Sequence, residues 1–133
     1  MTVAVLVGVF GVLGALFRFA IDSWFAHHAS TRLLPSGKGH AGLHWPWATL
    51  VVNVAGCFII GVSHGLAAGL ALGPEWQTGL AAGLAGGLTT FSSWTTATVR
   101  LASEARFGAA AVNLAANLFL GFAAAAAGIA LTT

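Results

Sequence analysis

Charged residues are scarce in this chain. Only 6% of its 133 residues are Asp, Glu, Lys or Arg, whereas 58% are hydrophobic. Because a soluble domain typically carries about 25% charged residues, so few charges cannot cover the surface of a soluble globule. The mean hydropathy of +0.91 also indicates that most of the chain lies in lipid. The net charge of +2 comes from very few groups and does not indicate a nucleic-acid partner.

Cysteine and titratable residues within apolar runs are equally rare. Cys57 is the single cysteine, so no intrachain disulfide can form, and we interpret it as a small buried residue. No Asp, Glu, Lys or His lies near the middle of an apolar run, and His64 comes nearest. A proton-coupled exporter usually needs a carboxylate at depth in the membrane, which argues against a small dual-topology multidrug/proton antiporter. The sequence also lacks the nucleophile–base set or metal-ligand cluster of an enzyme, so we expect no enzymatic activity.

Four apolar runs are present, and each is long enough for the roughly 20 residues of a membrane-spanning helix. They cover about residues 3–25, 47–72, 76–101 and 107–131. They predict an all-α membrane protein with a single four-helix domain over residues 1–133. The first run has no basic n-region and is too long for a signal peptide, so we expect a retained helix. All four runs are rich in small residues that allow close packing in lipid, and such a thin bundle favours oligomerisation.

The loops differ in charge. With four spans, the segments around residues 26–46 and 102–106 lie on the same side of the membrane. They carry or adjoin four basic residues, and this excess favours a cytoplasmic position: Arg32, Lys38, Arg100 and Arg106. Four histidines occupy the first segment at irregular spacing among Gly and Pro, which indicates solvated side chains rather than a metal site: His27, His28, His40 and His44.

Polar residues recur inside the predicted spans. Thr49 and Asn53 share one face of the second helix, and Asn113 and Asn117 repeat the same spacing on the fourth. The third run contains "GLAGGLTTFSSW" at residues 83–94. We predict that its two adjacent glycines weaken the helix at mid-membrane and that hydroxyls satisfy the freed backbone groups. Unwound backbone exposes carbonyls, which can coordinate a cation such as Na⁺.

Two interpretations of these polar residues remain open. They hold helices together by hydrogen bonds in a non-transporting membrane assembly subunit, or they line an ion pathway. Amide and hydroxyl donors, together with the positive edge of an aromatic ring such as Phe91, suit a small anion that loses its water. The residues alone therefore predict a small ion-conducting oligomer with donor-lined walls, with the assembly subunit as the alternative.

Three stretches resemble the Fluc (CrcB) family of fluoride channels. "GVLGALFRF" at residues 11–19 is similar to the family's Gly-rich first helix, which ends in Arg. "ATLVVNVAGCFIIG" at 48–61 is similar to the G-T-L-x-x-N-x-x-G-x-F-x-x-G second helix, with Ala48 for the first Gly. "GLAGGLTTFSSW" is similar to the G-x-x-G-G-x-T-T-F-S-T-F break of the third helix. The last helix fits more loosely, and the resemblance covers nearly the whole chain.

The resemblance implies a passive, selective channel that lets fluoride leave the cell through the plasma membrane. It implies an antiparallel, dual-topology homodimer in lipid, with a structural Na⁺ at its centre. The backbone carbonyls of Gly86 and Thr89 would bind this Na⁺. Arg18 would lie near a vestibule, and five residues would line the fluoride pathway by their match to the motifs: Thr49, Asn53, Phe91, Ser92 and Ser93.

This chain departs from the family pattern in three ways. Trp94 stands where the family usually has its second Phe; an indole ring is larger and adds an N–H donor. The chain has no Tyr for the fourth helix to bring to the pore, so we assign Asn113 and Asn117 to that place and prefer Asn117, which lies deeper in the span. The excess of basic residues in two loops opposes the even charge balance of dual topology, and the resemblance favours dual topology despite it.

Overall fold

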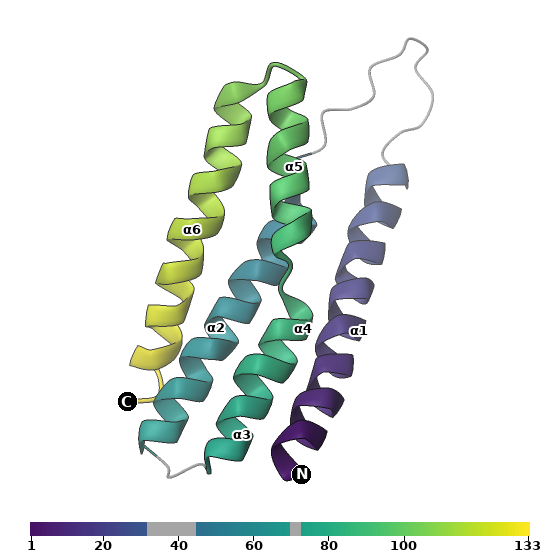
Figure 1. Cartoon of the computed structure of the whole chain (residues 1–133). Coiled ribbons are helices and arrows are strands. Elements are labelled where there is room, and N and C mark those ends of the chain that lie inside the picture. Colours follow the sequence, from purple (N-terminus) through teal and green to yellow (C-terminus); the bar gives the residue numbers. More distant parts are fainter. Residues whose placement is uncertain (32–44, 70–72) are drawn as a thin grey trace.

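The computed structural model describes residues 1–31, 45–69 and 73–133, and this part of the chain is helical apart from short turns (Figure 1). The spans run alternately up and down, so both chain ends lie at the same end of the bundle. The predictions made for Arg32, Lys38, His40 and His44 lie outside the described residues.

Three spans are long single helices. They are α1 (Thr2–Thr31), α2 (Trp47–Gly69) and α6 (Phe107–Ala130). Their most apolar windows have mean hydropathies of 2.3, 1.9 and 1.7, and each helix is long enough to cross a membrane. The first helix continues beyond the predicted end at residue 25, to Thr31, whereas the other two follow the predicted spans closely.

The third span is divided into several pieces. It starts with α3 (Pro74–Thr78), in which Pro74 occupies the first turn, and continues through the π-helical segment η1 (Gly79–Ala85). The short helix α4 (Gly86–Leu88) ends the first half, and α5 (Phe91–Ser103) forms the second. The predicted break in this span is confirmed, and the widened π-helical turns are a feature that the sequence pattern did not predict.

The break lies after the two glycines and not at them. Gly86 and Gly87 are helical, whereas Thr89 and Thr90 are extended, with ψ of 158° and 114°. The helix therefore breaks just after the glycine pair, at Thr89 and Thr90. The reason is that Thr90 starts a new helix: its Oγ1 accepts a hydrogen bond from the N–H of Ser93 at 3.2 Å and caps α5.

The glycines instead allow neighbouring helices to touch. A side chain on Gly87 would collide with the backbone of Gly11 and Ala15 in α1, and one on Gly14 would collide with α4 in return. At the other side of the bundle, a side chain on Gly128 of α6 would run into the backbone of α2 near Phe58. Small residues thus permit the backbone contacts on which helix association in lipid depends, as predicted.

Candidate ion pathway at the break of the third span

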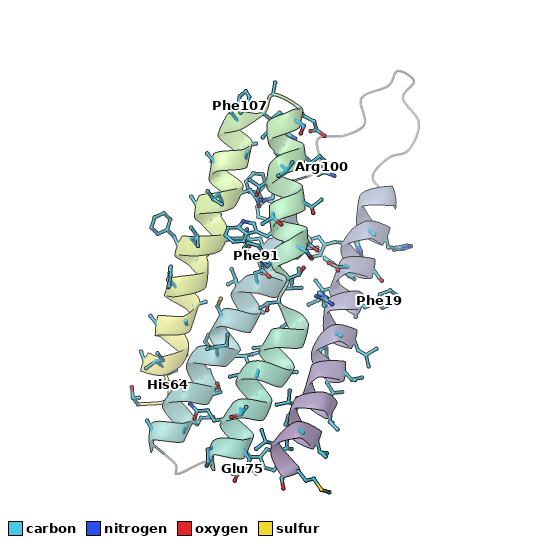
Figure 2. All side chains as sticks on the ribbon, viewed as in Figure 1. Phe19, His64, Glu75, Phe91, Arg100 and Phe107 are labelled. Carbon is cyan, nitrogen blue, oxygen red and sulfur yellow. The ribbon has the colours of Figure 1, made fainter. Side chains whose placement is uncertain are left out.

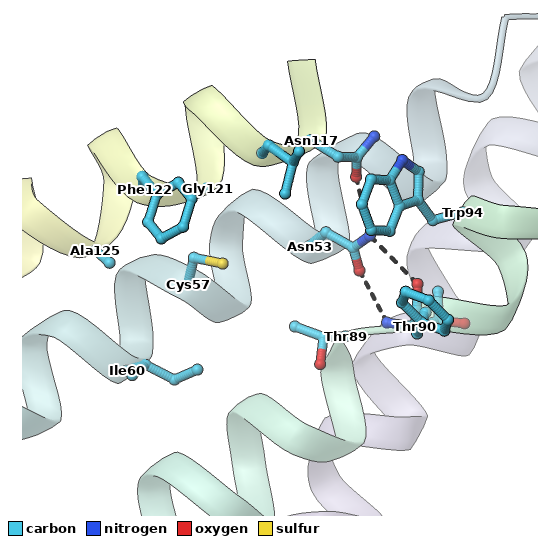
Figure 3. Close-up of a pocket in the computed structure, with 12 residues that line it drawn as sticks. Asn53, Cys57, Ile60, Thr89, Thr90, Trp94, Asn117, Gly121, Phe122 and Ala125 are labelled. Atoms are coloured by element: carbon cyan, nitrogen blue, oxygen red, sulfur yellow. Dashed lines mark hydrogen bonds between the residues drawn. The ribbon is translucent and has the colours of Figure 1, made fainter. Parts of the chain in front are cut away.

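Asn53 of α2 holds the break in place. Its Oδ1 accepts a hydrogen bond from the N–H of Thr90 at 2.8 Å, and its Nδ2 donates to the carbonyl of Thr90 at 3.3 Å (Figure 3). The same Nδ2 also donates to Oδ1 of Asn117 at 2.9 Å. Because the N–H of Thr90 no longer donates within a helix, the Asn53 amide oxygen supplies its partner, and the Asn53 N–H adds a second donor to the Thr90 carbonyl.

The two asparagines of α6 extend this network. Asn117 Nδ2 donates to the backbone carbonyl of Asn113 at 3.0 Å and to its Oδ1 at 3.3 Å. Asn113 Nδ2 donates in turn to Oγ1 of Thr98 in α5 at 2.9 Å. Asn113 is fully buried and Asn117 nearly so. The amides therefore connect α2, α6 and α5, which is the helix-joining role that the sequence left open.

An open cavity of about 380 Å³, which we call the aromatic cavity, lies beside this network (Figure 3). Phe91 and Trp94 border it at the start of α5, with ring centroids 5.6 Å apart and planes at 78°, an edge-to-face pair. Phe91 is 73% exposed. The other lining residues come from α2, the break and α6: Asn53, Cys57, Ile60, Thr89, Thr90, Asn117, Leu118, Gly121, Phe122 and Ala125.

The indole N–H of Trp94 already has a partner. Its Nε1 donates to the backbone carbonyl of Asn113 at 3.3 Å. The extra N–H donor of Trp, which Phe lacks, therefore points at α6. The ring presents only its C–H groups to the aromatic cavity. This hydrogen bond also fixes the ring orientation against α6.

A second cavity of about 430 Å³, which we call the hydroxyl cavity, lies on the other side of α5. Thr49, Ser92 and Ser93 line it, together with Thr96 and Arg100. Trp45, Pro46 and Ala97 complete its wall. The residues assigned to one pathway are thus divided by the first turns of α5, with rings and amides on one side and hydroxyls on the other. Asn113 lines neither cavity.

Arg18 lies at the break itself. Its Nη1 donates to the carbonyl of Thr89 at 3.2 Å, so a cation on α1 holds one of the two carbonyls assigned to Na⁺. The other, on Gly86, has lost its helical donor, because the N–H of Thr90 goes to Asn53. The carbonyl of Gly86 can therefore serve as a cation ligand without a competing donor. The carbonyl of Thr89 already accepts from the guanidinium and has one lone pair left for a cation.

Sequence reasoning missed several lining residues. Cys57 was interpreted as a small buried side chain, but it is half-buried and lines the aromatic cavity. A usable signal exists, because Cys57 and Gly121 each lie one helical turn after an asparagine of the cluster and so share its face. No comparable signal marks Trp45 or Arg100, which reach the hydroxyl cavity through tertiary packing.

Comparison with known proteins places the chain in a family. The family model described as CrcB-like protein, Camphor Resistance (CrcB) matches residues 5–129. The Fluoride-specific ion channel FluC of Renibacterium salmoninarum is 46% identical over 129 residues, which cover 97% of this chain and 98% of the relative. The protein of the same name from Azotobacter vinelandii is 39% identical over 139 residues, covering 98% and 95%.

The chain therefore belongs to the CrcB family. With three membrane-length helices and a fourth, broken span, it is a multi-pass protein of the bacterial inner membrane. The resemblance of the three motifs to this family is confirmed.

Proposed function

We propose that this chain forms a fluoride-selective ion channel through which fluoride leaves the cell passively. The names and near full-length similarity of its relatives support this function. The observation that carries the proposal is the convergence of Asn53, Phe91, Trp94 and Asn117 on one cavity at the break of a membrane span. Assembly of a helix bundle alone does not require such a hollow within the membrane.

The chemistry of the two cavities suits an anion. The hydroxyl cavity offers O–H donors and a guanidinium, and the aromatic cavity offers ring edges with partial positive charge. No Asp or Glu is among the residues that line either cavity, so no fixed negative charge opposes an anion there. We propose that fluoride exchanges its water for hydroxyl donors first and then passes the rings of Phe91 and Trp94.

Asn53 plays a supporting part in this proposal. Its amide hydrogens donate to Thr90 and Asn117, so Asn53 stabilises the break whether or not an ion is bound. The bond to Asn117, like the bond to Thr90, joins two residues that line the aromatic cavity (Figure 3). Fluoride, a charged acceptor, forms a stronger hydrogen bond than an amide oxygen does, so we propose that it competes for this N–H as it passes.

We further propose that two copies assemble as an antiparallel, dual-topology homodimer around a structural Na⁺. One chain supplies only the carbonyls of Gly86 and Thr89, and a second copy would complete the ligand set. Phe91 is largely exposed at the break, which supports a partner that packs against the start of α5. So does the thinness of the bundle, in which only 6% of the apolar window of α1 is buried.

The test is ion efflux from liposomes that contain the purified protein. A fluoride electrode and a chloride electrode record release after a potassium ionophore removes the voltage limit. We expect fast fluoride efflux, no chloride efflux and no dependence on a pH gradient. Efflux driven only by a pH gradient would favour an antiporter, and no efflux from folded protein would leave the assembly subunit as the function.

A further inference from the structure

Trp94, Asn113 and Thr98 are joined in a closed set of hydrogen bonds, which we call the indole network. The indole Nε1 of Trp94 donates to the backbone carbonyl of Asn113 at 3.3 Å. Asn113 Nδ2 donates to Oγ1 of Thr98 at 2.9 Å, and this hydroxyl donates to the backbone carbonyl of Trp94 at 2.8 Å. Both the ring and the backbone of Trp94 are therefore tied to the same residue of α6.

Asn113 and Thr98 lie behind the wall of the candidate pathway. Asn113 is fully buried, and its Oδ1 accepts from Asn117 Nδ2 at 3.3 Å. Neither Asn113 nor Thr98 is among the residues that line the aromatic cavity or the hydroxyl cavity. Trp94 does line the aromatic cavity, together with Phe91 at the start of α5 (Figure 2). An effect of Asn113 or Thr98 on an ion there has to pass through a side chain that lines the cavity, and Trp94 is bonded to both.

An indole ring at this position needs to be held in one orientation. Side chains exchange between staggered rotamers, and the hydrogen bond to Asn113 requires one that directs the N–H to α6. Fluoride is a charged acceptor and binds an N–H more strongly than a backbone carbonyl does. An indole N–H that turned toward the aromatic cavity would therefore retain the ion, whereas conduction requires binding weak enough for the ion to leave. A phenylalanine has no such donor and needs no such partner.

We propose that Asn113 and Thr98 are positioning residues for Trp94. Through the indole network they direct the N–H to α6 and keep the C–H edge of the ring on the aromatic cavity. There the indole forms its edge-to-face pair with Phe91, with centroids 5.6 Å apart and planes at 78°. The inference rests on the proposed function and adds to it two residues that act on fluoride without contacting it. Asn113 and Thr98 then matter for conduction only while residue 94 is Trp.

Fluoride efflux from liposomes in two backgrounds tests this role. Thr98→Val keeps the shape of the side chain but removes the hydroxyl. The buried amide of Asn113 then loses its acceptor and moves to find another, and the indole N–H loses its fixed partner. Thr98→Val lowers the efflux rate about fivefold or more in the wild-type background, but stays within about twofold of Trp94→Phe when the two are combined. Thr98→Ser retains most of the rate because it keeps the hydroxyl.

Thr95 of α5 provides the matched control. Its Oγ1 donates to the backbone carbonyl of Phe91 at 3.0 Å, one helical turn back, as Thr98 does to Trp94. Within the described part of the chain it forms no hydrogen bond to α6, and it lines neither the aromatic cavity nor the hydroxyl cavity. Thr95→Val leaves fluoride efflux within about twofold of the wild-type rate.

A second measurement observes the indole directly. In NMR spectra, protein that contains tryptophan labelled with heavy nitrogen gives one indole N–H signal for each of its five tryptophans. The signal that disappears in Trp94→Phe belongs to residue 94. Thr98→Val shifts this signal and speeds its hydrogen exchange with water, because the N–H has lost its fixed partner, whereas Thr95→Val leaves it in place. This readout depends on the orientation of the ring and not on conduction.

The outcomes separate the positioning role from the channel itself. If the wild-type protein conducts fluoride and Thr98→Val matches it, the positioning role is wrong and the channel stands. An equal loss in the wild-type and Trp94→Phe backgrounds shows that Thr98 acts on the packing of α5 and not through the indole, which also overturns the inference. An unmoved indole signal of Trp94 in Thr98→Val does the same. If the folded wild-type protein conducts no fluoride at all, the proposed function fails, and the positioning role in conduction fails with it.

Discussion

The ring of Phe91 takes little part in packing within its own chain but borders the aromatic cavity. Its ring is 73% exposed at the start of α5, beside the aromatic cavity. We predict that Phe91→Ile lowers fluoride efflux at least tenfold while the protein still folds. The ring edge is lost, whereas most of the bulk remains. Fluoride efflux from liposomes and the elution volume in size-exclusion chromatography give the two readouts.

Phe119 of α6 provides a control for this variant. It has the same exposed fraction, 73%, but lines neither the aromatic nor the hydroxyl cavity. Phe119→Ile should leave fluoride efflux within about twofold of the wild-type rate, because exposed apolar exchanges have small effects. Equal efflux from both variants would remove Phe91 from the pathway.

Trp94 is held by one hydrogen bond that the family's usual Phe cannot form. We predict that Trp94→Phe keeps fluoride efflux within about threefold and lowers the free energy of unfolding by about 1 kcal/mol. The ring edge remains in the aromatic cavity, and the carbonyl of Asn113 still accepts from Asn117 at 3.0 Å. Thermal unfolding in detergent and liposome efflux measure the two effects. Complete loss of efflux would mean that the pathway depends on the shape of the indole.

Individual residues were predicted well where helix periodicity determines their place. Asn113 and Asn117 are hydrogen-bonded to each other on one face of α6, as their spacing indicated, and Asn117 borders the aromatic cavity. Thr49 and Asn53, in contrast, line different cavities despite the same spacing. The partners of Asn53 could not be predicted. They are backbone groups of Thr90, 37 positions away. Helix periodicity does not determine which turn of α2 lies beside the break, because that depends on the axial offset between the two spans.

At the scale of helices, the third span shows how polar side chains replace the backbone hydrogen bonds that a helix loses at a break. The hydroxyl of Thr90 caps α5, the amide of Asn53 bonds the freed backbone of Thr90, and Arg18 binds the carbonyl of Thr89. The sequence predicted a break because glycines and hydroxyls occur together. Its exact position was not predictable, because glycine permits unwinding without requiring it, whereas a capping threonine with an extended backbone fixes the position.

The turn between α5 and α6 stores strain at one residue. Ala105 has φ of 56°, and two bonds typical of a Schellman motif close the turn: Arg106 N–H to Leu101 O at 2.9 Å and Ala105 N–H to Ala102 O at 3.0 Å. The left-handed conformation costs a residue with a Cβ roughly 1–2 kcal/mol. We predict that Ala105→Gly raises the free energy of unfolding by about 0.5–1 kcal/mol, after the greater freedom of glycine in the unfolded chain is subtracted.

Unfolding in detergent, followed by circular dichroism, measures this gain. Ala102→Gly is the matched control, because Ala102 lies within α5 in helical conformation. There the same exchange should lower the free energy of unfolding by about 1 kcal/mol. A loss of stability in both variants would show that the turn does not require glycine-like geometry.

At the scale of the whole molecule, four spans with both chain ends at one side give the two faces different charges. The turn at the far end carries Arg106 close to Arg100, with Glu104 as the nearby acidic residue. The side that holds the chain ends has Glu75 at the start of α3.

The arrangement of the four spans was predictable from apolar length alone. The orientation of the bundle was not, because the charge excess and the resemblance to a dual-topology family point in opposite directions.

Labelling from one side of the membrane resolves this conflict. In a Cys57→Ser background, Ser103→Cys reports the end of the bundle at the α5–α6 turn, and Thr133→Cys reports the opposite end; both positions are exposed. If the protein inserts in both orientations, a membrane-impermeant maleimide added to spheroplasts labels about half of each variant, because a small basic excess only biases insertion. Full labelling of Thr133→Cys with none of Ser103→Cys would establish a single orientation with the basic loops in the cytoplasm. An antiparallel dimer could not then form from this chain alone, and the Na⁺ site proposed between antiparallel copies would fail with it.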